Sequence, residues 1–132
     1  MDKVIAFIAL LCAAWSSIAI SGPLEYQCAI KSIHDLSDEG LMRESGWDSK
    51  MSGGHFTVTR STGEILGETL TTIMARGTRI VNPGSSENSF KATADFDGQI
   101  QLIEIQEFKE GNLKPFVALS MGGAGIVTGV CR

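Results

Sequence analysis

Two cysteines constrain the fold of this chain more than any other feature. Cys28 lies near the start of the predicted mature chain, and Cys131 is the penultimate of 132 residues. In an oxidising compartment such a pair forms a disulfide, whereas free thiols are the alternative in a reducing one. A disulfide holds its two Cα atoms within about 7 Å of each other. The first and last elements of the fold are therefore expected to be neighbours, as in a closed or nearly closed sheet.

The N-terminal segment has the three-part layout of a secretory signal peptide. A short polar start carries Lys3, residues 4–15 form an unbroken apolar run of 12, and residues 16–22 are rich in small side chains. The apolar run is shorter than the ~20 residues that a transmembrane helix requires. We therefore expect an exported protein, periplasmic or secreted, whose mature chain has no membrane span.

Cleavage of this leader is expected after Ser21, because Ala19 and Ser21 are both small. This gives a signal peptide over 1–21 and a single β domain over 22–132. Cleavage after Ala19 is the alternative. A lipid-modified Cys12 is disfavoured, because leucines rather than small residues precede it.

Charge and histidine content exclude several classes of function. The net charge of −4 gives no electrostatic reason to bind nucleic acid or anionic lipid. The two histidines, His34 and His55, lie 21 residues apart without ligand partners at zinc-site spacing, and a zinc site needs three or four ligands. No Gly-x-Ser-x-Gly nucleophile elbow occurs. We expect no metal, no cofactor and no nucleic-acid partner.

Apolar and polar residues alternate with period two through much of the mature chain. Turn signals recur about every ten residues, and no helical period is sustained. Seven to nine short strands result, which predicts an all-β fold, a small antiparallel barrel or sandwich. Strands are expected over 24–36, 56–59, 78–81, 90–96, 100–108, 115–121 and 126–132, and from residue 65 onward.

Three stretches carry more specific expectations. The segment Gly53–Gly67 predicts a β-hairpin with its turn at Ser61-Thr62-Gly63. A change of parity at Lys31-Ser32 predicts a bulge or an early end of the first strand. Residues 68–76 fit either a strand, which their β-branched content favours, or a helix.

Two further patterns concern the later strands. Asp97-Gly98 is the preferred pair for a two-residue type I′ hairpin turn. Residues 115–121 are apolar at both parities, which suggests a strand that is buried on both faces.

Three residues are candidates for a binding site. Arg60 shares the parity of Phe56 and Val58, so it extends past the core, pairs with a carboxylate such as Glu64, or faces a ligand. Trp47 lies in a polar segment and is either a lid over the barrel end or an exposed contact residue. His55, at the start of the hairpin, is the third candidate.

The pattern of glycines and aromatics adds a resemblance. Gly54-x-Phe56-x-Val58-x-Arg60-x-Thr62-Gly63, then Gly84-Ser85 with Asn88-Ser89-Phe90-Lys91, Lys114-Pro115-Phe116 and Gly129-x-Cys131 resemble a group of small exported bacterial β proteins of unassigned function. The resemblance implies a bacterial protein of the periplasm or exterior. It carries no active site to transfer.

These observations favour an exported, non-enzymatic β-barrel-like module that binds a small apolar molecule in its interior or an envelope protein at a sheet edge. One alternative is an enzyme whose site is assembled from His55, Arg60 and distant carboxylates. Another is a structural or assembly protein of the cell envelope. An internal cavity, an open edge strand, a convergent pocket or self-association would distinguish these hypotheses.

Overall fold

The structure, a computed structural model, describes residues 23–121 and 125–132. The predicted signal peptide therefore lies outside the described residues. These residues form nine strands and one short helix: β1 (Glu25–Leu36), β2 (Met42–Glu44), α1 (Asp48–Met51), β3 (His55–Thr59), β4 (Ile65–Gly67), β5 (Gly77–Pro83), β6 (Phe90–Phe96), β7 (Gln99–Ile105), β8 (Lys114–Met121) and β9 (Gly125–Cys131).

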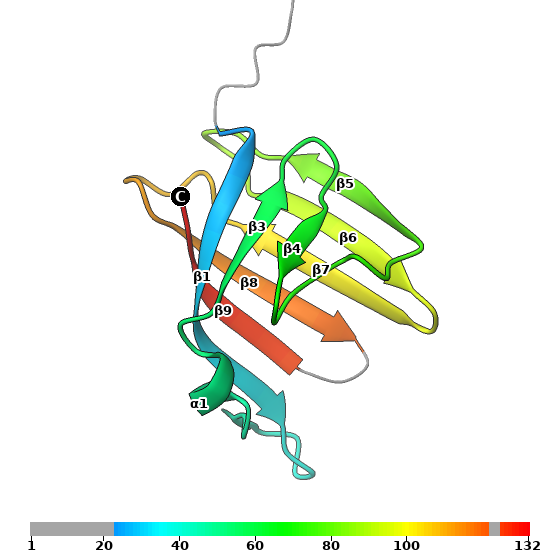
Figure 1. The fold of residues 1–132 in the computed structure, drawn as a ribbon. Helices are drawn as coiled ribbons and strands as arrows, with labels where there is room; N and C mark the ends of the chain where they lie inside the picture. The colour runs from blue at the N-terminus through cyan, green and yellow to red at the C-terminus, as the bar shows by residue number, and fades with distance from the viewer. Residues whose placement is uncertain (1–22, 122–124) are drawn as a thin grey trace, which may run out of the picture.

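All nine strands belong to one antiparallel sheet. Its order is β4-β3-β1-β9-β8-β7-β6-β5, and β2 pairs with the far end of β1. The sheet curls into a half-barrel (Figure 1), so the turn between β3 and β4 lies over Ile80 and Ala92 on the opposite side of the core. The all-β prediction is confirmed. The sheet is barrel-like because it is curled, but it is not completely closed.

The hairpin of β3 and β4 forms as predicted, because Phe56 and Val58 are buried while the alternate residues are not. The core on the inner face is filled by large side chains. Tyr26 packs on Phe90 with ring centroids 5.2 Å apart, and Phe56 meets Phe116 edge to face at 5.1 Å. The other buried apolar residues surround these four: Cys28, Ile30, Ile33, Val58, Ile65, Leu70, Ala92, Ile103, Ile105, Ala118, Val127 and Cys131.

Cys28 and Cys131 form the predicted disulfide between the first and last strands. They lie directly opposite in the pairing of β1 with β9. The neighbouring pair, Gln27 and Arg132, exchanges both backbone hydrogen bonds, so the cysteines occupy a non-hydrogen-bonded position, where strands approach most closely. Their Cα atoms are 4.0 Å apart. Both cysteines are buried.

A bulge divides β1 into two halves with different neighbours. The pairing with β9 shifts register between Ile30 and Ser32, which confirms the irregularity predicted near Lys31. Residues 25–29 pair with β3, and residues 34–36 pair with β2. In Figure 1 the first half turns over the core, and the second half continues beside β9.

The prediction of a strand over 68–76 is wrong, and the helical alternative is wrong as well. The segment is irregular because it folds back on β4: Thr72 N–H donates to Ile65 O at 2.9 Å, and Ile65 N–H donates to Thr72 Oγ1 at 2.9 Å. The hydroxyl thus takes the place of a ladder partner.

The polar segment that holds Trp47 contains β2 and α1. The turn at Asp97-Gly98 connects β6 and β7 as expected, but it is not type I′. Gly98 has a φ of 77°, while no residue other than glycine has a positive φ in the part of the chain that the structure describes. A type I′ turn requires positive φ at both central positions.

Candidate functional site

Arg60 is buried and closes one end of the half-barrel. Its side chain is 4% exposed and its Nη2 lies 2.8 Å from Glu107 Oε2. Arg60 Nε and Nη2 also donate to Pro83 O at 3.2 and 3.1 Å. The guanidinium therefore ties the end of β3 to the end of β5 and to the segment after β7.

Tyr26 and Gly84 complete this buried cluster. The Tyr26 hydroxyl donates to Glu107 Oε2 at 2.8 Å, and Arg60 lies 5.6 Å from the centroid of the Tyr26 ring. Gly84 has a φ of 75°, and a Cβ there would collide with Glu107 Oε2. The parity predicted for Arg60 is confirmed, but its carboxylate partner is Glu107 rather than Glu64. Arg60 thus bonds within the fold, to Glu107 and to the backbone carbonyls of Pro83 and Gly84.

Because of the buried Tyr26 hydroxyl, we expect the stability of the folded protein to decline at alkaline pH. Burial raises the pKa of Tyr26, and the hydrogen bond to Glu107 and its negative charge raise it further, while Arg60 partly offsets them. In the unfolded chain the phenol ionises near its ordinary pKa of about 10. Because the native state keeps the proton above that pH, this contribution is complete below about pH 10 and declines above it.

Tyr26 is the only tyrosine of the chain, so phenolate absorbance reports this group alone. We expect no phenolate signal at pH 10 in the native protein and a normal titration in denaturant. The signal should appear at higher pH together with loss of β-sheet circular dichroism. Ionisation near pH 10 with the sheet intact would show that the phenol is not held in this cluster.

The structure does not bring His55 and Arg60 together. They lie at opposite ends of β3 and at opposite parities, five residues apart. At a rise of about 3.3 Å per residue this separation is about 16 Å. His55 lines two shallow surface hollows, one with Lys50 and Glu68.

Trp47 lies at the surface, beside the second half of β1. It precedes α1, its side chain is 56% exposed, and Lys50 Nζ lies 5.1 Å from its ring centroid. Helix α1 is fastened to β1 by Asp48 Oδ1, which accepts from Ile33 N–H at 2.6 Å. Trp47 is therefore exposed to solvent.

A hollow opens at the surface beside the Arg60 cluster. It has a volume of about 570 Å³ and is lined by Tyr26, Glu107, Lys114 and Arg132 among others. The interior itself is occupied by the buried aromatic and aliphatic side chains.

The edges of the sheet are partly covered. The outer side of β4 is bonded by Thr72. On β5, Thr78 Oγ1 donates to Thr62 O at 2.7 Å, and Pro83 O accepts from Arg60. Strand β2 has only three residues. Short, bulged and bonded edges are how proteins prevent strand addition.

The outer face of the sheet, opposite the core, carries a row of side chains that the packing of the core does not account for. One row of side chains crosses seven strands in register, and we call it the outer row. Its three central members are aliphatic and half-buried, its first member is a cation and its last is an anion. The outer row consists of Arg79, Thr93, Leu102, Leu119, Ile126, His34 and Glu44.

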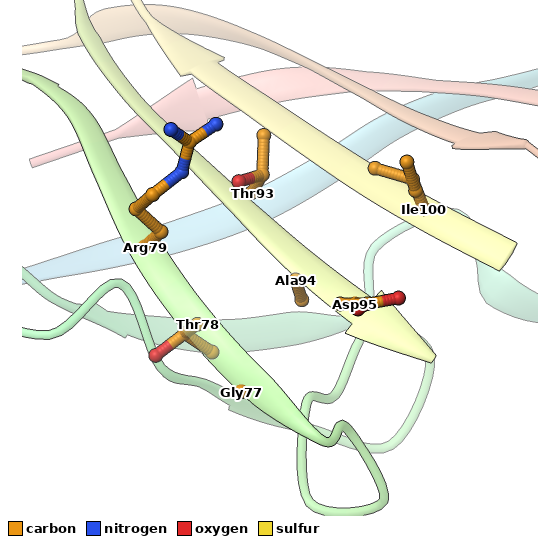
Figure 2. A pocket seen from close by; sticks show the side chains of 7 residues that line it. All are labelled: Gly77, Thr78, Arg79, Thr93, Ala94, Asp95 and Ile100. Carbon is orange, nitrogen blue, oxygen red and sulfur yellow. The ribbon is translucent and has the colours of Figure 1, made fainter. Parts of the chain in front are cut away.

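A second row of side chains runs parallel to the outer row and lies two residues away from it on each strand. At the β5 end, Gly77, Asp95 and Ile100 line a hollow of about 400 Å³ together with Arg79 and Thr93. Figure 2 shows Arg79 extending from β5 beside Thr93, with Ile100 across on β7. At the β2 end of the second row stand Leu36 and Met42, paired with each other and 63% and 47% exposed.

The sequence did not predict the outer row, although one pattern of apolar residues pointed to it. Residues 115–121 are apolar at both parities, yet among residues 115–120 only Phe116 and Ala118 are buried, while Val117 and Leu119 face outward and are half-buried. The expectation of burial on both faces is therefore not met within the described part of one chain.

No helix among residues 23–121 and 125–132 is long and apolar enough to cross a membrane. Within the same residues no three His, Cys, Asp or Glu side chains are grouped as metal ligands would be.

Comparison of the chain with protein-family models, with curated proteins and with solved structures finds no significant match.

Proposed function

We propose that this protein is an exported, non-enzymatic binding module that recognises a protein partner with the outer face of its sheet. The observation that carries the proposal is the outer row, in which Leu102, Leu119 and Ile126 stand side by side on the face opposite the core. A contiguous apolar strip rimmed by charges is typical of a protein-binding surface.

The alternatives have less support. A carrier of a small apolar molecule needs an interior cavity, and large side chains occupy the interior. Strand addition needs an open edge, and Thr72 bonds the edge of β4 while Arg60 bonds the last residue of β5. An enzyme built on His55 and Arg60 needs them in one pocket, and they stand at opposite ends of β3.

The partner is a protein rather than a membrane. Membrane-surface faces combine apolar side chains with an excess of Lys and Arg. The outer face carries both signs, with Lys91 and Glu104 3.8 Å apart beside the strip, and the net charge is −4. Export, periplasmic or to the exterior, is supported by the signal-peptide layout and by the disulfide.

Site-specific photo-crosslinking in the protein's native cells tests this function. Benzoylphenylalanine is introduced at Leu119, in the middle of the outer row, and as a matched control at Glu64, an exposed residue beside the β3–β4 turn. We expect a light-dependent protein adduct from position 119 and none from position 64. No adduct at 119, or equal adducts at both positions, would overturn the proposed function.

A further inference from the structure

The outer row is self-complementary, and we propose that the partner it binds is a second copy of this chain. This inference rests on the proposed function and names the partner. The row begins at Arg79 and ends at Glu44, and its middle member is Leu119. We place a twofold axis between the two sheets, passing over Leu119 and parallel to the strands. This axis brings the two outer faces together and reverses the order of the row in the second copy. Arg79 then faces Glu44 of the partner subunit, and the reverse contact follows by symmetry.

The same operation brings the remaining members of the row together, with Thr93 opposite His34 of the partner subunit. Leu102 faces Ile126 of the partner subunit, and Leu119 faces its own counterpart, so the aliphatic centre is paired throughout. Measured along the curled sheet, six strand spacings of about 4.8 Å give the row a length of about 29 Å. The axis also leaves the strands of the two sheets aligned, which is a preferred arrangement of sheets packed face to face.

The charges select this axis over its alternative. A twofold axis parallel to the row would place Arg79 on Arg79 and Glu44 on Glu44, and like charges in contact are strongly disfavoured across an interface. Both residues are exposed. Neither takes part in a salt bridge among residues 23–121 and 125–132, so both charges are available to a partner.

The second row provides an independent match. Its β5 end is the hollow lined by Gly77, Asp95 and Ile100, and its β2 end is the exposed pair Leu36 and Met42. The axis that pairs Arg79 with the partner's Glu44 brings Leu36 and Met42 of the partner subunit opposite this hollow. A projecting apolar pair at one end and a recess without a side chain at Gly77 at the other form a reciprocal fit.

Charge reversal combined with sedimentation tests the pairing in the mature protein. We expect the wild type to sediment as a dimer, and Arg79→Glu and Glu44→Arg each to raise the dissociation constant at least about tenfold, because each creates two like-charge contacts per dimer. The double variant, with both charges exchanged, should recover the dimer. The exposed controls Lys109→Glu and Glu87→Arg change net charge by the same amounts away from the row and should have no effect.

A wild type that stays monomeric at concentrations up to about 0.1 mM would overturn the pairing. Single variants that dimerise like the controls, or a double variant that is not restored, would do the same. The mass of the adduct from position 119 separates this inference from the proposed function. An adduct of twice the chain mass supports both. An adduct of another mass leaves the function in place and overturns the pairing.

Discussion

Removal of the disulfide should lower the free energy of unfolding by about 4–5 kcal/mol. The bond joins residues 103 positions apart, and chain-entropy estimates for loops of about 100 residues give about 4.7 kcal/mol. This is a large part of the 5–15 kcal/mol that typically separates native and unfolded domains. The variant is the double substitution Cys28→Ala with Cys131→Ala, which leaves no free thiol in the mature chain.

Urea unfolding followed by far-ultraviolet circular dichroism measures this loss, with the wild type in reductant as the matched control. Trp47 is the sole tryptophan after the predicted leader and supplies a second probe by fluorescence. We expect the two probes to agree. A loss below about 1 kcal/mol would mean that pairing between β1 and β9 holds the chain ends without the bond.

Replacement of Arg60 by Met should destabilise the protein by about 3–5 kcal/mol, because it leaves the carboxylate of Glu107 buried without its cation. The two side chains are only 4% and 11% exposed. The carbonyls of Pro83 and Gly84 lose their donor at the same time. Thermal and urea unfolding of Arg60→Met measure the effect.

The matched control is Arg76→Met. Arg76 makes an ion pair of the same length with Asp97, but the side chains are 66% and 91% exposed, and exposed pairs contribute about 0–1 kcal/mol. The combined variant Arg60→Met with Glu107→Met should recover part of the loss, since no charge is then left buried. Equal effects of Arg60→Met and Arg76→Met would show that the buried cluster does not close the half-barrel.

The sequence predicted those parts of the fold that depend on local patterns. Strand β6 was readable because Phe90, Ala92 and Ala94 alternate with polar residues over a full strand. The adjacency of β1 and β9 followed from the two cysteines alone. The bulge at Lys31 followed from a change of parity. Each of these signals is contained in neighbouring residues or in a covalent bond.

The predictions that failed, and the features that were not predicted, depend on contacts between distant segments. Thr72 bonds Ile65 and so removes residues 68–76 from the sheet, which β propensity does not register. Arg60 was placed on the correct face, but its partner lies 47 residues away. The outer row joins residues from seven strands, and it becomes visible only once the register of every pair is known.

Native mass spectrometry of the mature protein, with its disulfide intact, tests the central claim most directly. If the outer face binds a second copy, the spectrum should show two chains, each two hydrogens lighter than the reduced chain, and no bound small molecule. A single chain at every concentration would contradict the pairing of outer faces. A single chain that retains a small molecule would make the protein a carrier instead.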